Sequence, residues 1–255
     1  MGEKLLEVKD LTINFSGLKA VDTLNFSIDK GEIFGLIGPN GAGKTTTFNM
    51  ISGALKPTSG EVWLNGQRID GNYMYQTNKL GIARTYQNIN LFRSMTVLEN
   101  LLVGQHCRLT CGLAPAILRT PRERKEEAAA VEKAKETLEF CGLHEKIDVY
   151  SNSLSYGEQR ILEIARALVS DPYLIILDEP AAGMNPTEKN SLADLVQRIR
   201  AKGVTVLLVE HDMKFVMGIT DRICVLNYGK RIALGTPAEV QANPEVIEAY
   251  LGGGD

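Results

Sequence analysis

The sequence predicts an α/β fold in which helices cover a mostly parallel sheet, with an antiparallel β part at the N-terminus and an inserted helical part. A continuous apolar run at 33–37 ends in a glycine-rich loop that opens a helix. Short apolar runs at 173–177 and 204–209 alternate with helical segments, as in a parallel sheet that is covered on both faces. Between these parts, residues 96–142 have mostly helical composition.

The N-terminal segment predicts two antiparallel strands. Apolar and polar residues alternate over 11–15, the period of a half-buried strand, and a turn near 16–17 leads to a partner strand at 21–28. The run at 33–37 is apolar throughout, which predicts a strand buried on both faces. Shorter strands are predicted at 61–64 and 81–86.

Helices are predicted from composition and apolar spacing. A helix over 45–52 ends at Gly53, a residue type common just after helix ends. Residues 122–139 are rich in Ala, Glu and Lys, and their mixed charges indicate an amphipathic helix with a solvated face. Apolar side chains at helical spacing predict a helix over 155–169, and another helix is predicted over 186–201.

Composition excludes several classes of protein. With 255 residues, 44% hydrophobic and 23% charged, the chain falls in the range of globular proteins and outside that of disordered or fibrous ones. The net charge of −3 argues against a nucleic-acid partner. The longest informative uncharged stretch, 109–118, is far shorter than the roughly 20 apolar residues of a membrane-spanning helix, and the start has no apolar signal core. We therefore expect a cytosolic chain.

The cysteines are scattered along the chain. A zinc site usually needs a second pair of ligands, and only His106 lies beside the closest two cysteines. The sequence therefore predicts free thiols at Cys107, Cys111, Cys141 and Cys224.

The segment after the buried strand matches the phosphate-loop pattern Gly-x-x-x-x-Gly-Lys-Ser/Thr. Its glycines let backbone N–H groups turn inward around phosphate oxygens, and the following helix presents its positive end. Lys44 adds a positive charge at the β- and γ-phosphates, and the Thr45 hydroxyl can bind Mg²⁺. The predicted nucleotide-binding residues are Gly38, Pro39, Asn40, Gly41, Ala42, Gly43, Lys44, Thr45 and Thr46.

Polar residues follow two further predicted strands. Asp178 and Glu179 come directly after the apolar run 173–177, and His211 follows the strand at 204–209. Because parallel strand ends converge at one edge of a sheet, Asp178 can hold Mg²⁺ through water and Glu179 can polarise an attacking water there. Taken alone, the acid pair also fits a helix cap or a surface turn, and His211 fits a surface histidine.

The segment Leu154–Gln159 is not a generic GTPase or kinase element. Ser155 can cap the helix that follows and Gly157 allows a close backbone approach, which alone indicates only the start of a helix. Placed between the phosphate loop and the acid pair, however, this segment resembles one in the nucleotide-binding subunit of ATP-binding-cassette (ABC) transporters. The likeness covers nearly all of the chain.

The resemblance implies a role for each motif. Gln87 matches the glutamine that touches Mg²⁺ and senses the membrane subunit. Asp178, Glu179 and His211 match the Mg²⁺-site aspartate, the catalytic glutamate and the switch histidine. The signature loop, which completes the ATP site of a partner subunit, matches Ser155, Tyr156, Gly157, Glu158 and Gln159.

Three positions depart from the family pattern. Tyr156 stands where the signature usually has its first glycine, and Glu158 precedes the glutamine. Asn185 stands where the family usually has aspartate, and it keeps a hydrogen-bond acceptor while losing the charge. None of these changes removes an element of the hydrolysis chemistry, but Asn185 is expected to alter communication between two ATP sites.

Two apolar features fit the core as well as a functional role. Phe15 resembles the aromatic residue that stacks on adenine in the family, yet it shares a strand face with two core-type residues. Residues 88–96, with Leu91, Phe92 and Met95, fit either a core segment or a cleft that receives a short helix of a membrane subunit.

Some segments narrow the resemblance to an ATPase subunit of the branched-chain amino-acid (Liv-type) importers. The segment 105–124 and the ending 248–252 look similar to that subunit as well. Importers of urea or short amides use very similar subunits, and the ATPase of lipopolysaccharide export shares the ending. The segments that carry the closer likeness are 48–53, 84–88, 91–92, 95–100 and 181–186.

The resemblance implies one ABC domain over 1–255 with a phosphate-loop NTPase fold. The ATP-binding core with its β subdomain is expected over about 1–87 and 166–255, and the helical subdomain with the signature over about 88–165. It implies ATP hydrolysis with ATP and Mg²⁺ as cofactors, powering uptake of branched-chain amino acids. An exporter ATPase remains an alternative, as does, more remotely, a soluble ATP-driven switch.

The expected partners also follow from the resemblance. They are a second cassette subunit, expected to be a different chain, two membrane-spanning permease subunits and, indirectly, an external solute-binding protein. No nucleic-acid partner is expected. The chain is expected to lie peripherally on the cytoplasmic face of the membrane.

Overall fold

The computed structural model describes residues 2–105 and 121–251 of the chain. Its contacts divide the chain into two compact units, which are described separately. The core unit contains Met1–Arg84 and Tyr173–Asp255, and the helical unit contains Thr85–Pro172. The uncharged stretch 109–118, together with Cys107 and Cys111, lies outside the described residues. Whether the two units act as one cassette stays a prediction.

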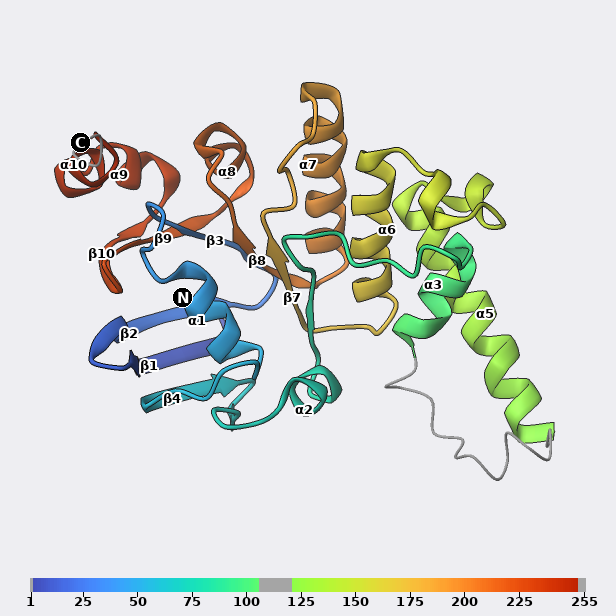
Figure 1. The fold of residues 1–255 in the computed structure, drawn as a ribbon, viewed down its shortest axis with the longest axis horizontal. Coiled ribbons are helices and arrows are strands. Elements are labelled where there is room, and N and C mark those ends of the chain that lie inside the picture. Colours follow the sequence, from blue (N-terminus) through green and yellow to red (C-terminus); the bar gives the residue numbers. More distant parts are fainter. Residues whose placement is uncertain (1, 106–120, 252–255) are drawn as a thin grey trace. The chain divides into compact units, whose positions relative to one another are not determined.

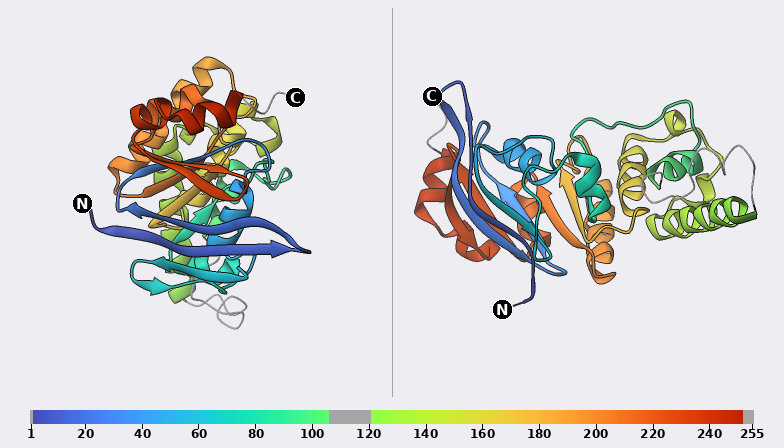
Figure 2. Two further views of the ribbon diagram at one scale, coloured as in Figure 1. Left: turned by 90° about the vertical axis from the view of Figure 1, so that its left-hand side faces the viewer. Right: turned by 90° about the horizontal axis from the view of Figure 1, so that it is seen from below.

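An antiparallel sheet forms the N-terminal part of the core unit. It contains β1 (Lys4–Phe15), β2 (Leu18–Asp29), β4 (Ser59–Leu64) and β5 (Gln67–Arg68) in the order β2-β1-β4-β5 (Figure 2, left). The predicted pairing of the first two strands is confirmed, and β1 extends the predicted strand at 11–15 back to Lys4. The turn between them falls at the predicted Ser16 and Gly17, both of which have positive φ.

The second sheet of the core unit is mostly parallel, as predicted. Its strand order is β10-β9-β3-β8-β7-β6, and every neighbouring pair is parallel except β9 with β10. All five residues of β3 are buried, which confirms the strand predicted to be buried on both faces. The strands are β3 (Ile33–Ile37), β6 (Ile82–Arg84), β7 (Leu174–Asp178), β8 (Thr205–Val209), β9 (Arg222–Asn227) and β10 (Lys230–Gly235).

Alternate residues of β3 pack on opposite layers of the core unit. Phe34 and Leu36 belong to the hydrophobic core that includes the antiparallel sheet and the apolar face of α1 (Lys44–Ile51). Gly35 points the other way, and a Cβ there would lie 3.2 Å from a methyl group of Val216 in α8 (Met213–Ile219). The remaining helices of this unit are α2 (Met74–Lys79), α7 (Pro186–Ala201), α9 (Pro237–Gln241) and α10 (Pro244–Leu251) (Figure 1).

Within its described residues, 85–105 and 121–172, the helical unit packs three helices together. These are α3 (Val97–Gly104), α5 (Pro121–Cys141) and α6 (Tyr156–Leu168). Short 3-10 turns at His144–Lys146 and Ser151–Ser153 lie between α5 and α6. Capping boxes start α3 at Thr96 and α6 at Ser155. In each, the hydroxyl accepts a hydrogen bond from the backbone N–H of a glutamate three residues later, and that glutamate's carboxylate accepts one from the backbone N–H of the capping residue. The helices predicted at 122–139 and 155–169 are therefore confirmed within a few residues of their ends.

Three predictions about the chain have mixed outcomes. The strand predicted over 81–86 is confirmed only over Ile82–Arg84, so the prediction is wrong by one residue at its start and two at its end. Cys224 is a free thiol, as predicted, and burial raises its pKa to about 12. Across the described ranges 2–105 and 121–251, no helix combines the length and the apolar character that crossing a bilayer requires.

Candidate functional site

The glycine-rich segment forms a loop between the end of β3 and the start of α1, as the motif predicts. Glycine is required at two of its positions. Gly43, the N-cap of α1, has a φ of 98°, and a Cβ there would lie 2.6 Å from the Ala20 carbonyl oxygen. A Cβ on Gly38 would lie 2.2 Å from the carbonyl oxygen of Leu226. The loop therefore rests directly on the backbones of β2 and β9, where only glycine fits.

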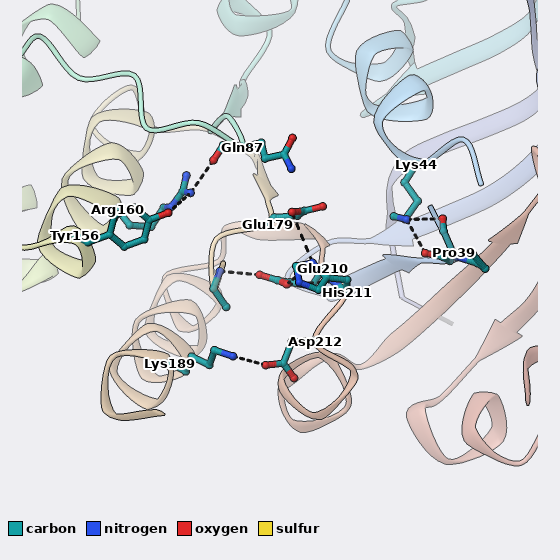
Figure 3. Close-up of polar contacts among 12 residues, drawn as sticks. Pro39, Lys44, Gln87, Tyr156, Arg160, Glu179, Lys189, Glu210, His211 and Asp212 are labelled. Atoms are coloured by element: carbon teal, nitrogen blue, oxygen red, sulfur yellow. Dashed lines mark hydrogen bonds and ion pairs between the residues drawn. The ribbon is translucent and has the colours of Figure 1, made fainter. Parts of the chain in front are cut away.

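Lys44 lies inside this loop. Its side chain is buried, and its ammonium group donates hydrogen bonds to the carbonyl oxygens of Gly38 at 2.6 Å and Pro39 at 2.9 Å (Figure 3). Burial lowers the pKa of Lys44, while the nearby charges of Glu179 and Asp178 act in the opposite direction. The ammonium is thus held inside the loop, and the charges of both acids raise its pKa against the effect of burial.

The start of α1 is suited to an anion. Among the described residues, no side chain hydrogen-bonds to its N-terminus, and its first turn contains no acidic residue. The N–H groups in the first turn of a helix are a common site for anions. The Thr45 side chain is exposed in that turn. A hydroxyl at this position and the carboxylate of Asp178 are oxygen donors, the ligand type that Mg²⁺ prefers. The predicted donor set therefore fits a magnesium ion.

Asp178 ends β7 and is held by an arginine from the neighbouring strand. Its carboxylate accepts a hydrogen bond from Arg84 Nη2 at 3.1 Å, and both side chains are largely buried. Arg84 Nη1 also donates to the Asn49 side chain on α1, at 2.6 Å. Arg84 therefore links the acid of the site to the helix that follows the phosphate loop. Sequence reasoning did not assign Arg84 a role, although it ends a predicted strand.

Glu179 adopts a backbone conformation that is rare for a non-glycine residue. Its φ is 47°, and its N–H donates to the carbonyl oxygen of Val209, the last residue of β8, at 2.9 Å. This turn brings Glu179 Oε2 to 3.6 Å from His211 Nδ1 (Figure 3). The structure therefore brings together the two residues that the sequence predicts to be catalytic. The imidazole is mostly exposed, so it can still reach a ligand.

A buried carboxylate supports this pair. Glu210 is 1% exposed, and it accepts hydrogen bonds from the backbone N–H groups of Ala181 at 2.7 Å and His211 at 3.2 Å. Burial raises the pKa of Glu210, and the bond from Ala181 acts in the opposite direction. Glu210 therefore ties the segment after β7 to the segment after β8. Sequence reasoning missed it, although its signal was an acid directly after a buried strand.

A second link joins the same two segments. Lys189, in the first half of α7, donates to the Asp212 carboxylate at 2.5 Å, and this contact lowers the pKa of Asp212. Asp212 also caps α8 by accepting the Phe215 N–H bond at 3.1 Å. With Glu210, this ion pair fixes the loop that carries His211 against the loop that follows Glu179 (Figure 3).

Phe15 does not belong to the core. It is 45% exposed at the end of β1, whereas Leu11 and Ile13 on the same strand are buried. The strand pairing shifts register between Ile13 and Asn14, which breaks the shared face that the alternation suggested. The core interpretation is therefore wrong, and stacking on adenine stays a prediction.

Gln87 and the predicted signature residues belong to the helical unit. The Ser155 hydroxyl accepts a hydrogen bond from the Glu158 backbone N–H. The Glu158 carboxylate accepts a hydrogen bond from the Ser155 backbone N–H at 2.9 Å and forms an ion pair with Lys146. Gly157 is buried, and Gln159 donates to the Leu154 carbonyl oxygen at 2.9 Å. Glu158 is therefore the acidic N3 residue of a capping box, and this gives the departure from the family pattern at Glu158 a local structural reason. Asn185 caps α7 in the same way.

Comparison with known proteins identifies the family. A family model described as "ABC transporter" matches residues 21–182, more than half of the chain. A second, described as "Branched-chain amino acid ATP-binding cassette transporter", matches residues 230–255.

Relatives match over almost the whole length. The high-affinity branched-chain amino acid transport ATP-binding protein LivG of Escherichia coli K12 is 48% identical over 253 residues, which cover 99% of each chain. The corresponding BraF protein of Pseudomonas aeruginosa is 45% identical with the same coverage. A crystal structure of the ADP conformation of an ATP-binding cassette has a TM-score of 0.86 at 34% identity, covering 98% of this chain and 99% of that one. The chain, with Lys44, Asp178, Glu179 and His211 in one unit, therefore belongs to the ABC transporter family as an ATP-binding, ATP-hydrolysing subunit.

Proposed function

We propose that this chain powers the uptake of branched-chain amino acids across the cytoplasmic membrane. The observation that carries the proposal is the 48% identity over the full length to a protein named for high-affinity branched-chain amino acid transport. The match of residues 230–255 to a family described by the same solutes supports it. The solute does not contact this chain, because membrane subunits and an external binding protein select it.

The core unit supplies the groups that bind the phosphates. Lys44 and the backbone N–H groups at the start of α1 neutralise the β- and γ-phosphates, while the exposed Phe15 stacks on the adenine. Thr45, Asp178 and Gln87 would hold Mg²⁺, and the bound ion would offset negative charge on the phosphates.

Glu179 and His211 act on the reacting groups. Glu179 orients the attacking water and accepts its proton, and its left-handed backbone fixes the carboxylate at the edge of the sheet. His211, which lies 3.6 Å from that carboxylate, donates to the γ-phosphate. Glu210 and the Lys189–Asp212 pair keep the two loops in register, so that both side chains are positioned before ATP arrives.

Assembly completes the site. The two units act as one cassette, and the residues Ser155–Gln159 cover the ATP held by a second cassette, which we take to be a different chain. Two permease subunits dock on the helical unit, so the chain lies peripherally on the cytoplasmic face of the membrane. Because hydrolysis then requires the closed pair of cassettes, ATP turnover depends on the state of the permease.

The test replaces the chain in its own organism with the Glu179→Gln variant and measures uptake of labelled leucine, isoleucine and valine. We expect uptake of all three to fall at least tenfold while urea uptake is unchanged. Tagged wild-type chain should also co-purify two permeases and a second cassette. Unchanged amino-acid uptake, or loss of urea uptake alone, would overturn the proposed solute.

A further inference from the structure

The helical unit contains a fully buried ion pair in the middle of α6. The side chains of Arg160 and Glu163 are 0% and 1% exposed, and Arg160 Nη1 lies 2.9 Å from Glu163 Oε2. Burial raises the pKa of Glu163, and Arg160 opposes that shift. Arg160 Nε has no hydrogen-bond partner within the described part of the chain. A buried pair of this kind adds little stability over an apolar pair of similar size.

The pair holds the backbone on which Gln87 is carried. Arg160 Nη2 donates to the Gln87 carbonyl oxygen at 2.8 Å (Figure 3). Arg160 Nη1 donates to the Tyr86 carbonyl oxygen at 2.7 Å. In return, the Tyr86 N–H donates to Glu163 Oε1 at 3.3 Å. The backbone at 85–88 is in neither a helix nor a strand. The side chains of Arg160 and Glu163 therefore supply hydrogen bonds to this backbone that a neighbouring strand would supply in a sheet.

The same guanidinium group contacts the signature segment. The Tyr156 hydroxyl accepts a hydrogen bond from Arg160 Nη2 at 3.4 Å, and the guanidinium carbon lies 6.0 Å from the centre of the Tyr156 ring. Tyr156 is the residue that stands in the place of the usual first glycine of the signature. A tyrosine at this position thus reaches the group that holds Gln87, which a glycine cannot do.

We propose that Arg160, Glu163 and Tyr156 are positioning residues that fix the Gln87 segment to the start of α6, so that Gln87 and the signature residues 155–159 move as one body. This rests on the proposed function, in which Gln87 contacts Mg²⁺ in the chain's own site and the signature covers the ATP of a second cassette. A displacement of Gln87 by the permease is then transmitted to the opposite ATP through a rigid connection within this chain. The two ATP sites are coupled in this way without a direct contact between them.

The first experiment removes the charges without leaving one of them unpaired. In the double variant Arg160→Met with Glu163→Leu, apolar side chains of similar volume replace the pair, so the fold is expected to persist. Hydrogen–deuterium exchange on the purified chain then follows the peptide that contains Tyr86 and Gln87. We expect exchange there to become at least tenfold faster, while exchange in α5 stays unchanged. Lys133→Met, which alters an exposed ion pair of the same unit, is the matched control.

The second experiment measures coupling in the assembled transporter. We expect the double variant to bind ATP normally without Mg²⁺, to need several times more Mg²⁺ for half-maximal hydrolysis, and to lose at least tenfold of its stimulation by transported solute. Arg160→Lys keeps the charge but cannot form the fork to two carbonyl oxygens, so it should show the same loss even if the double variant does not fold.

The outcomes separate the two proposals. Wild-type exchange at Tyr86 and Gln87 in either variant, or unchanged Mg²⁺ dependence and stimulation, overturns the positioning role. If no branched-chain amino acid stimulates ATP hydrolysis by the wild-type transporter, the proposed function is overturned instead. The exchange measurement on the isolated chain does not depend on which solute is transported.

Discussion

Phe92→Asp tests whether the apolar segment 88–96 is a docking surface for a membrane subunit. The structure places Phe92 on the surface of the helical unit with 46% of the residue exposed, and the Arg166 guanidinium carbon lies 5.8 Å from the centre of its ring. The segment does not depend on the ring, since its backbone is held by Asn100, which both donates to and accepts from Phe92. The core interpretation of Phe92 is therefore wrong, and the docking role can be tested on folded protein.

The magnitude follows from this geometry. Fully burying a phenylalanine contributes about 1.5–3 kcal/mol, so a half-exposed ring contributes about 1 kcal/mol. The contact with Arg166 adds about 0.5–1 kcal/mol, part of which the new carboxylate recovers by pairing with that arginine. We expect the melting temperature to fall by only a few degrees, since about 1 kcal/mol corresponds to roughly 2–4 °C in a domain of this size.

The effect on assembly should be much larger. A carboxylate buried at an apolar contact costs several kcal/mol, and about 3 kcal/mol already weakens binding more than a hundredfold. Melting temperature, ATP binding and co-purification of the permeases should be measured on one preparation. Tyr75→Asp is the control, because Tyr75 is an exposed aromatic residue of the core unit. Retained assembly with normal coupled transport would refute the docking role, and a collapse of the fold would refute the stability argument.

Three further changes probe the core unit. Lys44→Ala should abolish ATP binding measured by calorimetry, because the loop loses its buried cation, and unchanged affinity would contradict the phosphate-loop assignment. Glu179→Gln should keep ATP binding and lower turnover by about two orders of magnitude or more; gel filtration with Mg-ATP should show a stable dimer, and near-normal hydrolysis would reject Glu179 as the base. Glu210→Gln tests the pH dependence of stability. Burial raises the pKa of Glu210 above its ordinary value of 4.5. The contribution of Glu210 to the free energy of unfolding is therefore fully present below pH 4.5 and is lost as pH rises through the raised pKa. The melting temperature of wild type minus that of Glu210→Gln should therefore fall as pH rises from 4 towards neutral, and a constant difference would show that Glu210 is not strained by burial.

Much of the core unit could be predicted from the sequence because its signals are local. A continuous apolar run predicted β3, glycines at fixed spacing predicted the phosphate loop, and acids after a buried run marked the end of β7. The strand predicted over 81–86 fails at its end for a tertiary reason. The backbone of Tyr86 bonds to Arg160 and Glu163 in α6, partners that no local pattern reveals.

The strands after residue 209 and the roles of Arg84 and Glu210 were not predicted from the sequence. No strand was predicted after residue 209, and β10 is a partly exposed edge strand with little alternation to reveal it. Arg84 and Glu210 each act through a partner on another strand or loop, so their roles depend on the order of strands in the sheet. What the sequence offers for such residues is only a charged side chain where a buried strand ends.

The contact between the phosphate loop and the hairpin of β9 and β10 has a consequence for how the chain can be shortened or fused. The Gly229 N–H donates to the Ala42 carbonyl oxygen at 3.1 Å, and a cavity of about 650 Å³ beside this contact is lined by Asn40 and Tyr228 together with Glu245 and Glu248 of α10. The segment matched by the branched-chain family model begins at Lys230, directly after this turn. The matched segment includes Glu245 and Glu248, so the part of the chain that is particular to one group of ABC transporters lines the cavity beside the glycine-rich loop common to all of them. A deletion or bulky fusion in that tail is therefore expected to change nucleotide affinity.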